Sequence, residues 1–137
     1  VKEREYLISS DILRGYNDII VLGLLIGQDS YGYNLMQEIS VRSGHTWQMK
    51  ETTLYSVLSR LEKNGLVPSY SGTETMGRKR TYFHITPEGM DYYQQKCAEW
   101  METKQLIDRF TLPTLLPSSD RKDAAEYQLD KFLSKIE

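Results

Sequence analysis

Four apolar residues in the middle of the chain repeat with the period of a helix. They are Leu54, Val57, Leu58 and Leu61, at positions i, i+3, i+4 and i+7. This spacing gathers them into one stripe, on a helix that we expect to run from Glu51 to Asn64. Because such a stripe has to be buried, the helix can offer only its opposite side to a ligand.

Helices and a hairpin are expected around this element. The expected helices span residues 11–26, 31–42, 51–64, 87–109 and 120–136. Asp11 can cap the first helix, and Thr86-Pro87-Glu88 is a strong start for the fourth. Strands over 66–70 and 80–85, joined by a turn that contains Gly72 and Gly77, form a hairpin. A short strand is also expected over 46–49.

This order predicts a mainly α chain with a small β hairpin, arranged as a winged helix-turn-helix that is followed by a long C-terminal dimerisation helix. The expected parts are a winged domain over 1–86, the long helix over 87–110, and a linker with an amphipathic tail helix over 111–137. Pro113 and Pro117 should interrupt the long helix. An isolated helix as short as the tail is marginal in water, so we expect it to dock across the dimer. A frayed, disordered terminus is the alternative.

Charge is distributed unevenly along the chain. The net charge of the 137 residues is −2, but residues 42–80 carry seven Lys/Arg and three Asp/Glu. A basic middle inside an acidic protein is the asymmetry expected when one face meets phosphates. The single cysteine, Cys97, excludes an internal disulfide and favours a reduced, cytoplasmic setting. The longest apolar run, 19–26, is too short to cross a membrane.

Three segments resemble, in order, motifs of the PadR family of bacterial transcriptional regulators. Tyr31–Leu35 resembles the start of the family's second helix, Thr53–Leu66 its recognition helix, and Gly77–Gly89 its wing. The resemblance covers roughly residues 12–110. It implies a repressor dimer that binds operator DNA, with the long and first helices forming the dimer interface. Lys50-Glu51 departs from the pattern, because many members have a Pro-Gly step there.

The residues expected to contact DNA lie on the side of the third helix opposite the stripe, and in the only run of three cations. They are Lys50, Thr52, Thr53, Tyr55, Ser56, Ser59, Arg60, Lys63, Arg78, Lys79 and Arg80. Small polar side chains let a helix approach base edges, and cations at a hairpin tip suit phosphates. The alternatives are an ordinary solvated helix face and a solubilising turn. Glu51 faces the same way as Lys50 with the opposite sign.

Spacings of three and four also mark a seam on the long helix. It comprises Met90, Tyr93, Cys97, Trp100, Lys104 and Ile107. Tyr16 and Asn17 would join it where the first and fourth helices meet. This set is the expected dimer interface. In some members of the family that the chain resembles, a tryptophan at the place of Trp100 lines an effector pocket. Trp100 as an ordinary packed interface residue is the equal alternative.

Nothing in the sequence indicates catalysis. The chain has no phosphate-binding loop, dinucleotide fingerprint or nucleophile elbow, and neither His45 nor His84 has metal-ligand spacing with Cys97. We therefore expect no enzyme, cofactor or metal. The favoured function is a repressor released by a hydrophobic or aromatic small-molecule effector near the dimer interface. A protein-interaction module without DNA binding and a small-molecule scavenger are the alternatives.

Overall fold

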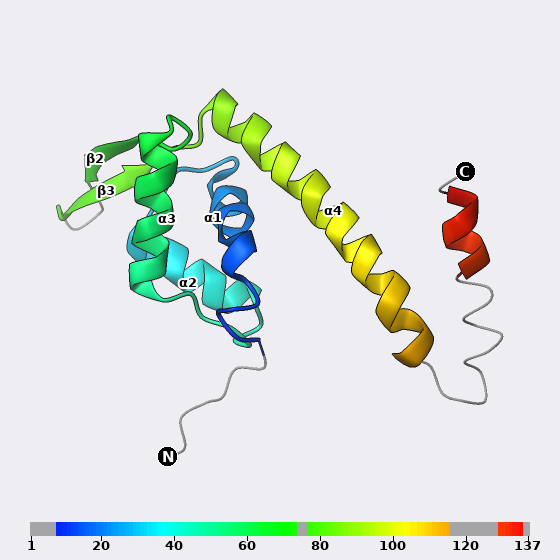
Figure 1. Cartoon of the computed structure of the whole chain (residues 1–137). Coiled ribbons are helices and arrows are strands. Elements are labelled where there is room, and N and C mark those ends of the chain that lie inside the picture. Colours follow the sequence, from blue (N-terminus) through cyan, green and yellow to red (C-terminus); the bar gives the residue numbers. More distant parts are fainter. Residues whose placement is uncertain (1–7, 74–76, 116–128, 136–137) are drawn as a thin grey trace, which may run out of the picture. The chain divides into compact units, whose positions relative to one another are not determined.

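The computed structural model describes residues 8–73, 77–115 and 129–135. The chain divides into two compact units, residues 1–97 and 98–137. The first unit holds three helices, a small sheet and the beginning of the long helix α4 (Figure 1). The second holds the rest of α4 and a helix over 129–135.

The first helix is shorter than its sequence suggests. A 3₁₀ turn, η1 (Arg14–Tyr16), precedes α1 (Asn17–Leu25). The expected start at Asp11 was therefore wrong. Its carboxylate accepts a hydrogen bond from the Arg14 side chain at 2.7 Å and caps no helix. Gly15 lies in the 3₁₀ turn, where its low helix propensity counts against an earlier start. Helices α2 (Gly32–Arg42) and α3 (Glu51–Lys63) match their expected positions closely.

Three strands form the sheet, whereas the sequence predicted a two-stranded hairpin. The order is β1 (Ser30–Tyr31), β3 (Lys79–Phe83), β2 (Ser69–Thr73), all antiparallel neighbours. Strand β2 begins later than expected because the backbone N–H groups of Leu66 and Val67 donate to the carbonyl of Leu61 and close the end of α3.

The short strand expected over 46–49 was wrong. Residues 47–50 have no regular structure, although Trp47 and Met49 are buried. Their alternating burial resembles that of a strand, but in this loop it comes from two side chains that fill the core.

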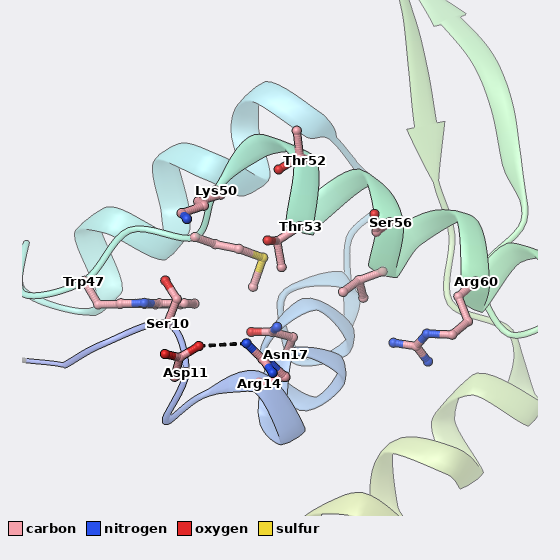
Figure 2. Close-up of a pocket in the computed structure, with 12 residues that line it drawn as sticks. Ser10, Asp11, Arg14, Asn17, Trp47, Lys50, Thr52, Thr53, Ser56 and Arg60 are labelled. Atoms are coloured by element: carbon pink, nitrogen blue, oxygen red, sulfur yellow. Dashed lines mark hydrogen bonds and ion pairs between the residues drawn. The ribbon is translucent and has the colours of Figure 1, made fainter.

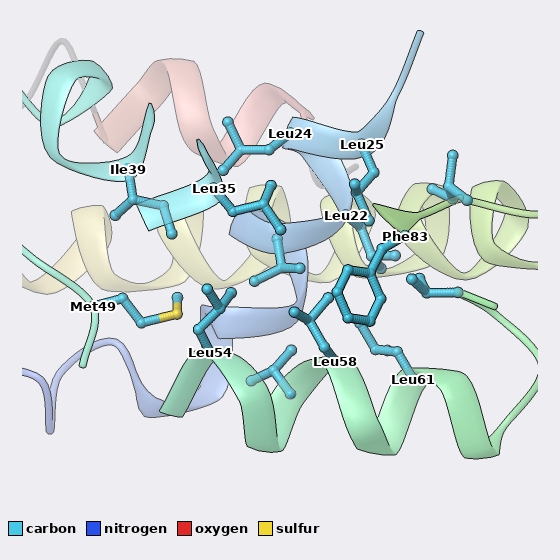
Figure 3. Close-up of a cluster of buried hydrophobic side chains, with 14 of the residues drawn as sticks. Leu22, Leu24, Leu25, Leu35, Ile39, Met49, Leu54, Leu58, Leu61 and Phe83 are labelled. Carbon is cyan, nitrogen blue, oxygen red and sulfur yellow. The ribbon is translucent and has the colours of Figure 1, made fainter. Parts of the chain in front are cut away.

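The buried stripe of α3 forms the centre of the core. Leu54, Val57, Leu58 and Leu61 are all at most 5% exposed, as the spacing predicted. They pack with buried side chains of α1, α2 and β3, labelled in part in Figure 3. Phe83 and Ile85 belong to the same cluster. The core thus fixes which side of α3 faces outward.

The long helix α4 (Pro87–Leu115) starts where the sequence predicted and ends later. The backbone N–H of Gly89 donates to the Thr86 hydroxyl at 3.0 Å, which caps the helix. The expected break before Pro113 was wrong, because the helix includes this proline. Pro113 lies in the final turn of the helix. There the loss of its backbone N–H donor disturbs little helix beyond it. No helix in the described ranges has the length and hydropathy needed to span a membrane.

The tail is described only in part. Residues 129–135 are helical, and the Arg109 guanidinium lies 5.9 Å from the centre of the Phe132 ring. The expected linker around Pro117 and the expected helix start at Asp120 lie outside the described residues. Docking of this helix across a dimer stays a prediction.

Two glycines inside helices should respond oppositely to alanine. A Cβ atom at Gly89 would lie 2.5 Å from the Leu66 carbonyl oxygen. Since backbone cannot easily yield, Gly89→Ala should lower the free energy of unfolding by about 1–3 kcal/mol. A Cβ atom at Gly23 would lie 3.4 Å from its nearest neighbours, which are atoms of the Tyr93 side chain. Gly23→Ala should be neutral or stabilise by up to about 1 kcal/mol through helix propensity. Urea denaturation of both variants checks the pair, and equal effects would contradict it.

Candidate nucleic-acid interface

The outward side of α3 is polar over its whole length. Thr52, Tyr55, Ser56, Ser59 and Lys63 are exposed. With Arg60, they line one shallow hollow of about 730 Å³. Six of the α3 residues expected to contact DNA thus lie on one surface, whereas Lys50 and Thr53 line a separate pocket. Three of the six side chains, those of Thr52, Ser56 and Ser59, are short hydroxyls that let another molecule approach the helix backbone closely.

The Tyr55 side chain, on the outward side of α3, packs against Gly32 at the start of α2. A Cβ atom at Gly32 would lie only 2.1 Å from the Tyr55 hydroxyl oxygen, so the tyrosine fits because residue 32 has no side chain. A groove of about 530 Å³ runs beside this contact. It is lined by Gly32, Tyr33, Met36, Gln37, Ser40, Gln48, Glu51, Tyr55 and Arg80. The N-terminal ends of α2 and α3 and one cation of β3 thus share one groove.

Arg60 is held by a carboxylate that the sequence did not single out. Its guanidinium donates two hydrogen bonds to Asp18 of α1, at 3.0 and 2.5 Å, and the Tyr92 hydroxyl of α4 donates a third at 2.7 Å. Burial alone would raise the pKa of Asp18. The bonds from Arg60 and Tyr92 outweigh it and hold the pKa below the ordinary 3.8. This network joins three helices, and Arg60 serves it while remaining at the edge of the polar surface.

The sequence suggested that the three consecutive cations all lie at the tip of the wing. In the structure only part of this run does. Arg78 precedes β3 and is exposed, whereas Lys79 and Arg80 are strand residues, paired with Thr73 and Gly72. The Arg80 guanidinium lies 5.0 Å from the centre of the Tyr31 ring. Arg80 thus turns back toward the groove beside α3, while Arg78 and Lys79 remain near the tip.

A second group of side chains fixes the base of the wing. Asp29, just before β1, accepts a hydrogen bond from the Tyr70 hydroxyl at 2.6 Å and lies 2.7 Å from Nδ1 of His84. The bonds to Tyr70 and His84 lower the pKa of Asp29. The strand register also aligns Tyr31, Tyr82 and Tyr70 across the sheet. Sequence reasoning missed this group because its members meet only once β1 pairs with β3.

A pocket of about 390 Å³ lies beside the N-terminal half of α3 (Figure 2). It is lined by Ser10, Asp11, Arg14, Asn17, Trp47, Met49, Lys50, Thr52, Thr53, Ser56, Val57 and Arg60. Asn17, predicted at the seam, thus lines the same pocket as Lys50 and Thr53. Among the described side chains, the buried Oδ1 of Asn17 and Nε1 of Trp47 have no hydrogen-bond partner.

The seam residues of α4 fall into two groups. In the first unit, Tyr93 lies against Gly23 of α1. The hydrogen bond of Tyr93 to Cys97, together with partial burial, raises the tyrosine pKa. In the second unit, Trp100, Lys104 and Ile107 are exposed. Tyr16 is partly buried at the start of α1. The part of the chain that the structure describes contains no cluster of three or more His, Cys, Asp or Glu that could hold a metal.

Helix α2, the loop to α3, α3 itself and the strands that follow define a winged helix-turn-helix protein. A sequence model of the Transcriptional regulator PadR-like family matches residues 21–95. The chain belongs to this family, whose members are transcriptional regulators.

Similar proteins agree with this assignment. A transcriptional regulator from Clostridium thermocellum is 53% identical, with a TM-score of 0.69, over 74% of this chain and 99% of that one. A PadR family transcription regulator from Clostridium difficile is 33% identical, with a TM-score of 0.59, over 69% and 97%. Protein X of Lysinibacillus sphaericus is 44% identical over 76% of this chain and 95% of its own. The similarity to the first structure extends over nearly all of that regulator.

The Asp18 network should make a measurable contribution to stability. Asp18→Asn removes the charge that Arg60 pairs with, and should lower the free energy of unfolding by about 1–2 kcal/mol at neutral pH, since Arg60 is half exposed and partly screened. Because the folded-state pKa of Asp18 is lowered, this contribution is present above pH 3.8 and is lost as the pH falls through the folded-state value. The difference between wild type and variant should therefore shrink in acid.

The control for this measurement is Asp11→Asn. The Asp11–Arg14 pair is also short, at 2.7 Å against 2.5 Å for Asp18–Arg60, but both of its side chains are more than 80% exposed. This variant should leave stability unchanged. Urea denaturation at pH 7 and pH 3 compares the three proteins. A loss for Asp18→Asn that persists undiminished at pH 3 would show that the charge is not its cause.

Proposed function

We propose that the protein is a dimeric repressor that binds operator DNA through α3 and the wing. The observation that carries this proposal is the division of α3 into a fully buried apolar stripe and an outward side of hydroxyls and cations. A recognition helix in a major groove needs such a surface, with its N-terminal residues at the base edges. Arg78 and Lys79 contact phosphate from the wing.

Charge supports the same surface. Residues 42–80, which contain α3 and most of the wing, carry seven Lys/Arg and three Asp/Glu in a chain whose net charge is −2. The excess of positive charge therefore lies in the segment that is proposed to bind DNA, and steers DNA toward it. Two such protomers related by a two-fold axis would place their recognition helices about 34 Å apart, one turn of DNA, so the operator should be roughly palindromic.

Binding to DNA should depend steeply on salt and on the wing cations. Affinity for a duplex of the protein's own upstream region should fall sharply between about 50 and 200 mM salt, because phosphate contacts release counterions. Arg78→Ala/Lys79→Ala should weaken binding and lower the slope of log affinity against log salt by about two for each wing. Fluorescence anisotropy at several salt concentrations measures both quantities.

A matched variant separates local contacts from net charge. Lys131→Ala/Lys135→Ala removes two exposed cations outside the proposed surface and changes the net charge equally. It should leave the slope unchanged. Equal slopes for all three proteins, or binding that ignores salt, would argue against the proposed interface.

Dimerisation is proposed through α4, because the second unit leaves large apolar side chains uncovered. Trp100 is 42% exposed, and Met101, Leu106, Ile107 and Phe110 are each more than 50% exposed. Apolar residues concentrated on one helix mark a surface that another molecule covers. The spacing of the seam suits a second copy of the same helix.

Trp100→Asp should disrupt the dimer. The substitution would place a charge in the covered seam, where its desolvation is unfavourable. Sedimentation equilibrium at micromolar concentration should give a dimer for wild type and a monomer for the variant. Gln105→Asp, an exposed position on another side of the same helix, is the control and should stay dimeric. A monomeric wild type would refute this proposal.

Release from DNA is proposed to follow binding of a hydrophobic or aromatic effector near this seam. Trp100 supplies an aromatic surface, and Tyr93, Cys97, Lys104 and Ile107 recur along the same stripe. An effector that binds one spacing of the protomers better than another would shift the population away from the DNA-binding form. The protein would act in the cytoplasm, where its DNA is.

A further inference from the structure

Glu51 is an unusual residue for the surface proposed to meet DNA. It is the first residue of α3, and its side chain is exposed. Within the described ranges its carboxylate takes part in no hydrogen bond or ion pair. It lines the groove that also contains Tyr33, Gln37, Tyr55 and Arg80. A recognition helix brings this end closest to the bases, so the carboxylate would lie in the interface.

A carboxylate in that position has few favourable partners. It is repelled by phosphates and accepts hydrogen bonds without donating any. In the major groove, guanine offers acceptors only, and thymine an acceptor and a methyl group. Adenine offers an amino donor, but its N7 acceptor lies beside it. Cytosine alone presents its amino group without an adjacent acceptor on the same base. A hydrogen bond to cytosine therefore offsets the repulsion from the phosphates better than contact with any other base.

We infer that Glu51 selects cytosine at one position in each half of the operator, by accepting a hydrogen bond from the cytosine N4 amino group. This inference rests on the proposed DNA-binding function and deepens it. Two cations near Glu51 offset the repulsion between its carboxylate and the DNA phosphates. Lys50 precedes it, and Arg80 lies in the same groove. Glu51 thus lowers affinity for all other bases more than it raises affinity for cytosine.

A structural role for Glu51 predicts a different outcome. An acidic residue in the first turn of a helix stabilises the helix through its dipole, and that effect is indifferent to the base in the groove. Glu88 occupies the corresponding first turn of α4 and is exposed. Glu88→Gln therefore reproduces the loss of a helix-start charge away from α3, and is the matched control.

The test is selection of DNA by the full chain from a duplex library with a randomised segment, followed by sequencing. Wild type, Glu51→Gln, Glu51→Ala and Glu88→Gln are compared, with thermal melts to confirm that each is folded. Glutamine pairs with adenine through both N6 and N7. Glu51→Gln should therefore exchange cytosine for adenine at one position of each half-site and leave the other positions unchanged. Glu51→Ala should lose the preference there and bind random duplexes more tightly.

The strength of the preference is measured next with defined duplexes. Wild type should bind the selected site about tenfold more tightly than the same site with that cytosine replaced. The ratio should fall to about one for Glu51→Ala and stay unchanged for Glu88→Gln. If all four proteins select the same motif, the inference is overturned while the proposed function stands. If wild type selects no motif, the proposed function fails, and the inference fails with it.

Discussion

The burial of one side of α3 is the constraint on which the rest of the first unit depends. Four of its side chains fill the centre of the core, with α1, α2 and the last residues of the wing packed around them. Burial of large aliphatic side chains contributes roughly 1.5–3 kcal/mol each, so the helix cannot rotate about its axis without a large loss of stability. The same packing that stabilises the domain therefore fixes the orientation of the outward side chains.

Hydrogen bonds and ion pairs fix the relative orientation of the elements, which apolar packing alone does not determine. Apolar surfaces pack without directional preference, whereas the hydrogen bonds around Asp18 depend on geometry. Arg60 near the end of α3, Asp18 near the start of α1 and Tyr92 in α4 meet at one carboxylate. This links α3 to α1 and to the first part of α4. In the sheet region, Asp29 joins the turn before β1 to Tyr70 and His84.

The sequence predicted the elements that have a local signal. Periodicity identified the stripe of α3, and Thr86 with Pro87 identified the start of α4. It did not predict β1, since two residues are too few for any pattern and this strand exists only through pairing with β3. Nor did it predict the Asp18–Arg60 pair, whose members lie far apart in sequence. For the interface, the exposed residues of α3 follow from the stripe, whereas the position of Arg80 beside Tyr31 depends on the register of the sheet.

Gly32 and Tyr55 carry a consequence for how this sequence can diverge. The tyrosine hydroxyl occupies the space that any side chain at position 32 would need. Each residue thus restricts the other, although they belong to different helices. A descendant that acquires alanine at position 32 must also shift or shorten residue 55, which lies on the outward side of α3. A change in the packing between α2 and α3 would then alter the outward surface of α3 by moving the Tyr55 side chain.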